Sequence, residues 1–160
     1  MRVTFIVVLF VIMGRIALSQ DIKVLDYKGI KPIIETRNDT TYVVNFWATW
    51  CSPCVKELPY FQKLHDNFRQ DKVKVLLVSL DFVKQIDSRL KPFLEKNKIT
   101  PQVLLLSDPD ANYWINEINP EWSGALPATI IFNRNFYRFY EKSFTYEELE
   151  LIINQNIIKP

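Results

Sequence analysis

The stretch "NFWATWCSPCVKE", Asn45–Glu57, contains both cysteines of the 160-residue chain, at positions 51 and 54. Two cysteines at this spacing form either a structural disulfide or a redox-active dithiol. A disulfide that closes only four residues restricts the unfolded chain by roughly 2 kcal/mol, against ~4.7 kcal/mol for a hundred-residue loop. The spacing therefore favours a reactive pair over a structural cross-link.

The segments on either side of the pair predict a strand followed by a helix. Residues 40–47, "TTYVVNFW", are β-branched and aromatic without alternation, which is typical of a strand buried on both faces. From Ser52 to Phe68 the apolar residues recur at helical spacing. Cys51 is then expected at the first turn of the helix, where free N–H groups and the helix dipole favour a thiolate. Cys54 follows one turn later on the same face, within reach of Cys51.

A metal site is not expected at the cysteine pair. The two cysteines and His65, which is the single histidine, do not supply the four ligands of a usual site. His65 has no acidic or cysteine partner at a suggestive spacing, and we expect it on the surface. No cofactor is predicted.

The first nineteen residues predict a secretory signal peptide cleaved after Ser19, which leaves a domain over residues 20–160. This segment has a single early Arg2, the apolar run "VTFIVVLFVIM" and the small-residue pattern "ALS". An uncleaved N-terminal membrane anchor, extended through "GRIAL", is the alternative. Cleavage places the domain in the periplasm or cell envelope, where disulfides persist.

The charge of the mature domain argues against nucleic-acid binding. Loss of Arg2 and Arg15 with the leader leaves eighteen basic side chains against eighteen acidic ones. Because the two signs are scattered among each other, the domain has no basic patch that would bind a phosphate backbone.

The remaining pattern predicts one α/β domain. After a short strand and a helix capped by Asp26, the expected elements are strands over 40–47, 73–80 and 102–108, helices over 52–68, 85–99 and 111–118, a hairpin over 126–144 and a helix over 145–157. Pro92 is tolerable only in the first turn of its helix. An asparagine at 133 or 135 is expected to take a positive φ in the hairpin turn. Thr145 and Glu148 form a capping box.

The quoted stretch, extended to "VVNFWATWCSPCVKELP", resembles the active-site segment of the thioredoxin superfamily, specifically of its exported TlpA/ResA/DsbE-like branch. The segment "SGALPATIIF" resembles the cis-proline strand of that family. The resemblance implies a thioredoxin-like fold, in which helices flank a central mixed β-sheet and a central βα-type insertion lies between "VSLD" and "WSGALP". It also implies thiol–disulfide exchange with other proteins.

Site residues follow from the resemblance one by one. Cys51 matches the attacking nucleophile, and Cys54 matches the resolving cysteine. Pro127 matches the cis-proline that faces them, and Leu126 matches the residue whose backbone pairs with a substrate strand. Glu57 matches an acidic residue near the cysteines; it is either a proton acceptor for Cys54 or an exposed first-turn acid that gains from the helix dipole.

Other side chains near the motif have competing interpretations. Trp50 is expected on the substrate-facing rim, and Trp47 in the core. Asn45 stands where cytosolic thioredoxins have a buried aspartate, and an asparagine cannot shuttle a proton. Asp81 follows a parallel strand at the same sheet edge, although a loop or cap role is favoured over a catalytic one. For Trp122, a core position and a position over the site are equally plausible.

These residues predict an exported thiol–disulfide oxidoreductase that reduces disulfides of envelope proteins. We expect a monomer that receives electrons from a membrane or envelope thiol donor. Ser52 and Pro53 add no cation beside the thiolate, which favours a reducing couple. One alternative is a thiol peroxidase, which usually has no C-x-x-C partner for its peroxidatic cysteine. The other is a non-catalytic binding module, which would not need both cysteines and Pro127.

Overall fold

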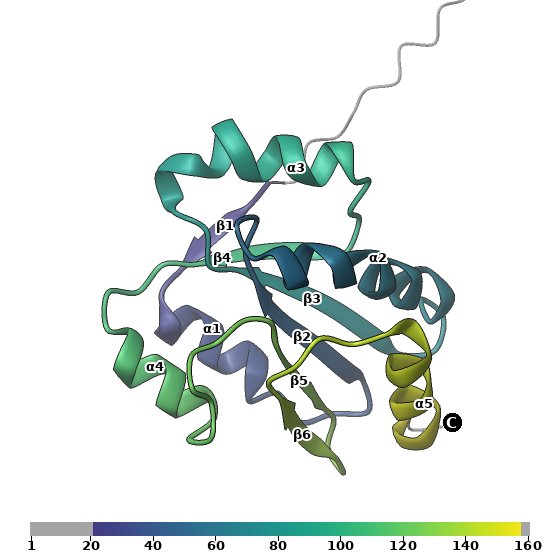
Figure 1. Ribbon diagram of the computed structural model, residues 1–160. Coiled ribbons are helices and arrows are strands. Elements are labelled where there is room, and N and C mark those ends of the chain that lie inside the picture. Colours follow the sequence, from purple (N-terminus) through teal and green to yellow (C-terminus); the bar gives the residue numbers. More distant parts are fainter. Residues whose placement is uncertain (1–20, 158–160) are drawn as a thin grey trace, which may run out of the picture.

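A computed structural model of the protein describes residues 21–157, and within them the strands form one six-stranded mixed sheet in the order β1-β4-β3-β2-β5-β6 (Figure 1). The strands are β1 Lys23–Leu25, β2 Thr41–Trp47, β3 Val73–Ser79, β4 Gln102–Leu106, β5 Ala128–Phe132 and β6 Tyr137–Tyr140. The first four run parallel, whereas β5 is antiparallel to β2 and β6 is antiparallel to β5. The predicted mixed sheet is confirmed. The expected leader and its cleavage site lie outside the described residues.

Helices cover both faces of this sheet (Figure 1). They are α1 Tyr27–Ile34, α2 Ser52–Asn67, α3 Lys91–Lys96, α4 Ala111–Ile118 and α5 Tyr146–Asn156. The buried side chains of α2, α3 and α5 pack in one hydrophobic cluster, and those of α1 and α4 pack in a second cluster on the opposite face. Within residues 21–157 no helix combines the length and the apolar character needed to cross a bilayer.

Strand β2 lies in the middle of the sheet, between β3 and β5. Its side chains contribute to both clusters, with Val43 and Trp47 on the α2 face and Val44 and Phe46 on the other. Burial on both faces explains why this segment is apolar without alternation. The chain leaves β2 at the carboxyl edge of the parallel strands and enters α2 there, so Cys51 lies where sites of α/β sheets collect.

The predicted insertion is the segment from η1 to α4, and it places β4 between β1 and β3. The single helix expected over 85–99 is interrupted: η1 Val83–Gln85 is a 3-10 turn, η2 Ile86–Leu90 is a π-helical turn, and α3 starts at Lys91. Pro92 lies in the first turn of α3, because the helix starts at Lys91 and not at residue 85; this meets the condition under which the proline is tolerated. A proline lacks an N–H and clashes with the carbonyl four residues earlier, so the wider turn before it avoids both problems.

The hairpin between β5 and β6 is closed differently from the prediction. Among the described non-glycine residues only Lys72 and Lys98 have a positive φ, so the expected left-handed asparagine is wrong. Instead, the side-chain oxygen of Asn133 accepts a hydrogen bond from the Asn135 amide at 2.9 Å, and the Asn133 amide donates to the carbonyl of Phe136. An asparagine whose side chain accepts from the backbone two residues ahead forms a turn without a positive φ.

Candidate active site

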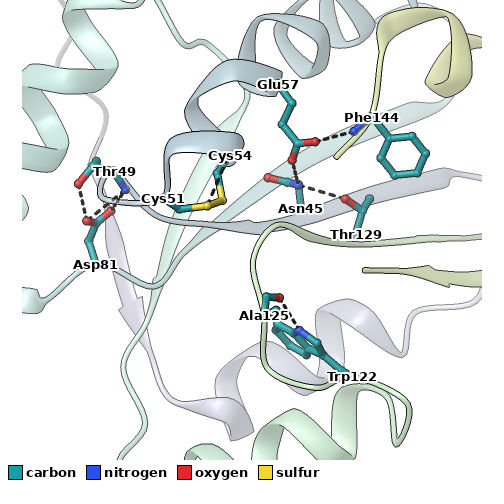
Figure 2. Close-up of a disulfide and its surroundings, with 10 residues drawn as sticks. All are labelled: Asn45, Thr49, Cys51, Cys54, Glu57, Asp81, Trp122, Ala125, Thr129 and Phe144. Atoms are coloured by element: carbon teal, nitrogen blue, oxygen red, sulfur yellow. Dashed lines mark hydrogen bonds between the residues drawn. A yellow bond between two sulfur atoms is a disulfide. The ribbon is translucent and has the colours of Figure 1, made fainter. Parts of the chain in front are cut away.

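Cys51 and Cys54 form a disulfide at the start of α2, with their Cα atoms 5.3 Å apart (Figure 2). Cys51 is the N-cap residue, and its sulfur accepts a hydrogen bond from the Cys54 amide at 3.3 Å. Cys54 is completely buried, whereas 6% of Cys51 is exposed. A sulfur that receives an N–H group at a helix N-terminus is stabilised as a thiolate once the pair is reduced. The geometry therefore favours Cys51 over Cys54 as the nucleophile.

The loop that precedes the disulfide is fixed by Asp81. Its buried carboxylate accepts hydrogen bonds from the Thr49 amide at 3.0 Å and from the Thr49 hydroxyl at 2.6 Å (Figure 2). Ser79, at the end of β3, donates to the same carboxylate at 2.8 Å. These contacts confirm the predicted loop role of Asp81. Trp50, which lies between Thr49 and Cys51 in the chain, is 52% exposed. Trp47 is buried in the core, as expected.

The peptide bond between Leu126 and Pro127 is cis, and it directly precedes β5. Because Ala128 pairs with Phe46 near the end of β2, this bond lies at the same edge of the sheet as Cys51. The Leu126 side chain packs against the hydrophobic cluster that contains both cysteines. Within the described residues, the Leu126 backbone makes no hydrogen bond. Its N–H and carbonyl groups are therefore free to pair with another chain.

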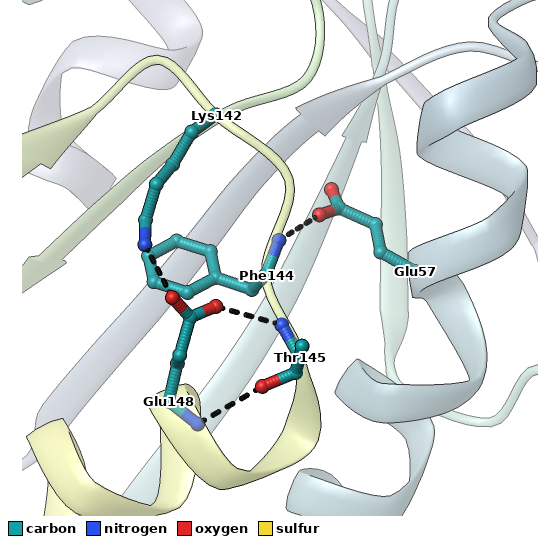
Figure 3. Close-up of polar contacts among 5 residues, drawn as sticks. All are labelled: Glu57, Lys142, Phe144, Thr145 and Glu148. Carbon is teal, nitrogen blue, oxygen red and sulfur yellow. Dashed lines mark hydrogen bonds and ion pairs between the residues drawn. The ribbon is translucent and has the colours of Figure 1, made fainter.

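Glu57 lies one turn beyond Cys54 on the buried face of α2, and only 2% of it is exposed. One carboxylate oxygen accepts from the Asn45 side-chain amide at 3.0 Å (Figure 2). The other accepts from the Phe144 backbone amide at 2.8 Å (Figure 3). Burial raises the pKa of Glu57 to about 7, although both hydrogen bonds act in the opposite direction. The interpretation of Glu57 as an exposed first-turn acid is therefore wrong. Its role as a proton acceptor stays a prediction.

Asn45 links this carboxylate to the sheet. Its Nδ2 group donates to Glu57 and also to the hydroxyl of Thr129, the residue opposite it on β5, at 3.0 Å (Figure 2). Its Oδ1 atom is buried and has no hydrogen-bond partner among the described residues. Asn45 therefore orients the carboxylate of Glu57.

Trp122 has a core position and a second role in the loop before Pro127. Its ring packs on Phe46 at 5.0 Å and on Trp114 at 5.6 Å between centroids. Its indole N–H donates to the Ala125 carbonyl at 2.8 Å (Figure 2). His65 lies on α2, two turns beyond Glu57, and is partly exposed; its partial burial lowers its pKa.

Three residues near the site were not found from the sequence. Phe144 binds Glu57 through a backbone amide, which no side-chain motif can reveal. Ser123 and Glu141 meet across the loop before Pro127 although they are 18 residues apart in the chain. The one feature of the local sequence that indicates this loop is the turn-forming pair "SG" before "ALP".

Comparison with known proteins assigns the family. The model of the AhpC/TSA family matches residues 19–136. The chain belongs to this family. It is 38% identical to sporulation thiol-disulfide oxidoreductase A of Bacillus subtilis (strain 168) over 63 residues, which cover 39% of this chain and 38% of that one. It is 27% identical to thiol-disulfide oxidoreductase ResA of Geobacillus kaustophilus (strain HTA426) over 118 residues, 73% of this chain and 62% of that one.

A solved structure shares the architecture. StoA from Bacillus subtilis superposes with a TM-score of 0.56 at 26% identity, covering 72% of this chain and 83% of that one. The predicted thioredoxin-like fold and the resemblance to the ResA-like branch are therefore confirmed. The matched part of the chain spans 38% and 62% of the length of the two curated relatives.

Proposed function

We propose that this protein is an exported thiol–disulfide oxidoreductase that reduces disulfides in other proteins. The observation that carries the proposal is the disulfide at the N-terminus of α2, at the same sheet edge as Leu126 and Pro127. A hydrogen-bonded sulfur at a helix start supplies a nucleophile, and an unpaired backbone nearby supplies a place for an extended substrate. The relatives named as thiol-disulfide oxidoreductases support this choice.

The reaction uses both cysteines in sequence. The Cys51 thiolate attacks one sulfur of the substrate disulfide, so that a mixed disulfide forms and the first substrate thiolate leaves and takes up a proton. Cys54 then loses its proton and attacks the Cys51 sulfur, which releases the second substrate thiolate. The substrate gains two electrons and two protons, and the protein ends as the Cys51–Cys54 disulfide. A thiol donor in the membrane or envelope reverses this oxidation.

Glu57 accepts the proton of Cys54 in this scheme. Its carboxylate lies one helical turn from Cys54 in the same buried layer, and burial raises its pKa to about 7. A carboxylate whose pKa approaches that of a thiol is a better base than an ordinary exposed one. Asn45 and the Phe144 amide keep it in place.

Substrate proteins bind along Leu126, Pro127 and Trp50. An extended segment beside the disulfide pairs with the free N–H and carbonyl of Leu126, and the exposed Trp50 ring covers apolar atoms next to it. Disulfide-bearing envelope proteins are the expected partners, and the protein acts as a monomer. The leader-like segment over residues 1–19 supports this location.

A trapping experiment tests the proposal. Cys54→Ser, reduced and mixed with insulin, is expected to accumulate a mixed disulfide through Cys51, because the step that resolves it has been removed. The matched control, Cys51→Ser with Cys54→Ser, is expected to form none. If Cys54→Ser traps insulin but the wild type does not catalyse the reduction of insulin by dithiothreitol, the enzymatic function would be contradicted. Rapid consumption of hydrogen peroxide with no reduction of insulin would favour the peroxidase alternative.

Processing of the N-terminus is tested separately. N-terminal sequencing of protein recovered from the producing cell is expected to begin at Gln20, in the soluble envelope fraction. A chain that keeps Met1 and sediments with membranes would instead support the anchored alternative.

A further inference from the structure

We infer that Glu141 is a positioning residue that holds the Leu126 backbone ready for substrate strands, through a clamp on the loop Ser123–Ala125. This inference rests on the proposed function, because it assumes that substrates pair with Leu126. In this clamp the Glu141 carboxylate accepts hydrogen bonds from backbone amides of the loop, and the Trp122 indole donates one to a backbone carbonyl of the loop.

The contacts of Glu141 are concentrated on two residues. Glu141 directly follows β6, and one of its carboxylate oxygens accepts from the Ser123 hydroxyl and from the Ala125 amide, the latter at 3.0 Å. The other oxygen accepts from the Ser123 amide at 3.2 Å. These hydrogen bonds, led by that of the Ser123 hydroxyl, lower the pKa of Glu141, so the clamp is anionic at neutral pH.

The opposite side of the loop is fixed from the core. The Trp122 indole donates to the Ala125 carbonyl at 2.8 Å, and its ring packs against Phe46 of β2 and Phe139 of β6. Gly124, between the two residues that Glu141 binds, has a φ of 90°, which L side chains rarely adopt. The loop therefore has a defined shape and little freedom.

The clamp directly precedes Leu126, and this position leaves the backbone groups of Leu126 available to a substrate. Both backbone groups of Ala125 are occupied inside the protein, the amide by Glu141 and the carbonyl by Trp122. Leu126, the next residue, makes no backbone hydrogen bond within the described chain, and Pro127 has no N–H to offer. The first free donor and acceptor after the clamp therefore belong to Leu126. Fixing them before binding reduces the ordering cost of docking.

The inference predicts a selective loss in Glu141→Ala. With reduced protein as catalyst, kcat/KM for insulin is expected to fall about tenfold, mainly through a higher KM, because a free loop must be ordered on binding. The rate with hydroxyethyl disulfide, which is too small to pair with a strand, and the equilibrium with glutathione are expected to stay unchanged. Glu141→Gln keeps one acceptor oxygen and should recover part of the loss.

Glu148→Ala is the matched control. Glu148 is also a hydrogen-bonded surface carboxylate near the hairpin, but it binds Lys142 and the Thr145 amide at the start of α5 (Figure 3). Its loss should lower the stability of the fold and leave the KM for insulin unchanged. Should Glu141→Ala fold poorly, Ser123→Ala tests the same clamp. It removes the hydroxyl that donates to Glu141 and that accepts a long hydrogen bond from the Ala125 amide at 3.4 Å, and it leaves Glu141 in place. We expect a KM increase of about threefold.

Two results would overturn the inference while leaving the proposed function intact. One is an unchanged KM for insulin in Glu141→Ala and Ser123→Ala; the other is an equal loss with insulin and hydroxyethyl disulfide, which would mean general damage to the site. A wild-type protein that reduces neither substrate would instead refute the proposed function, and the docking role of Glu141 with it.

Discussion

The two cysteines differ in their exposure to solvent. Cys51 caps α2 and is partly accessible, whereas Cys54 is completely buried under the same turn. In the reduced protein at neutral pH, iodoacetamide is therefore expected to modify Cys51 first, because helix N–H groups stabilise its thiolate. Peptide mass spectrometry over time gives the order of labelling. Faster modification of Cys54 would reverse the roles assigned to the pair.

Glu57 is expected to make stability depend on pH. Its folded-state pKa is raised from 4.5 to about 7 by burial, so the folded protein holds a proton that the unfolded chain has already lost. Its favourable contribution is present below pH 4.5 and disappears as the pH rises to about 7. Relative to Glu57→Gln, the wild type should lose roughly 2–3 kcal/mol of unfolding free energy across this range. Urea unfolding at several pH values measures the difference.

The same substitution separates catalysis from structure. If Glu57 accepts the Cys54 proton, Glu57→Gln should slow the release of the mixed disulfide and remove a step near pH 7 from the rate profile. Stopped-flow reduction of a model disulfide provides the rates. Identical profiles in both proteins, with a difference in stability alone, would make Glu57 a structural residue.

At the scale of elements, the disulfide contributes little to the stability of α2. It closes a loop of only four residues, which limits its effect on the unfolded chain to roughly 2 kcal/mol. In the reduced protein a Cys51 thiolate keeps its role as N-cap acceptor for the Cys54 amide. Thermal unfolding with and without dithiothreitol should therefore differ modestly. A loss of several kcal/mol on reduction would favour a structural disulfide.

The start of α5 lies next to the residue that binds Glu57. Thr145 and Glu148 form the predicted capping box, and the residue before them, Phe144, donates its amide to Glu57 (Figure 3). Thr145→Ala should cost about 1 kcal/mol of unfolding free energy, because the Glu148 amide loses its acceptor. Thr145→Ser keeps that acceptor and should recover most of the loss. Equal denaturation midpoints for all three proteins would show that the cap is dispensable.

Local elements were predictable because local chemistry defines them. Asp26 and Thr145 accept hydrogen bonds from amides three residues ahead, and Pro92 lies in a first turn, as the sequence indicated. The turn at Asn133 was predicted in place but not in conformation, because its side chain satisfies the backbone without a positive φ. The π-helical turn before α3 was missed because helical periodicity does not distinguish it from an ordinary turn.

The site was predictable where residues belong to a contiguous motif, or where the family resemblance supplied them, as it did for Pro127. The cysteine pair belongs to a contiguous motif, whereas the Glu57 environment joins β2, α2, β5 and the segment before α5. The contact between Glu57 and Phe144 spans 87 residues and uses a backbone amide. Such contacts arise from the sheet order, which places β5 beside β2, and not from any local pattern.

At the scale of the whole molecule, the redox potential of the cysteine pair depends on how stable the reduced protein is relative to the oxidised protein. The helix N-terminus favours the Cys51 thiolate, but Ser52 and Pro53 add no charge to it. We therefore expect a potential nearer to ~−270 mV, as in thioredoxin, than to ~−120 mV, as in DsbA. Equilibration with glutathione and dithiothreitol buffers gives the value. A potential above about −150 mV would identify an oxidant and reverse the proposed direction.

The position of β4 between β1 and β3 has a consequence for the order of folding. Among the strands over residues 21–157, β1 pairs only with β4, for example Lys23 with Leu104. The Tyr27 amide at the start of α1 donates to the Asp108 carboxylate, 81 residues away in the chain. By contrast, β2, α2 and β3 are consecutive in the chain, so the pairing of β2 with β3 closes a much shorter stretch of sequence. Since distant pairings pay more loop entropy before they gain contacts, the central unit can form early. Among the described strands, β1 is therefore expected to join the sheet only after this central unit has formed, although it comes first in the chain.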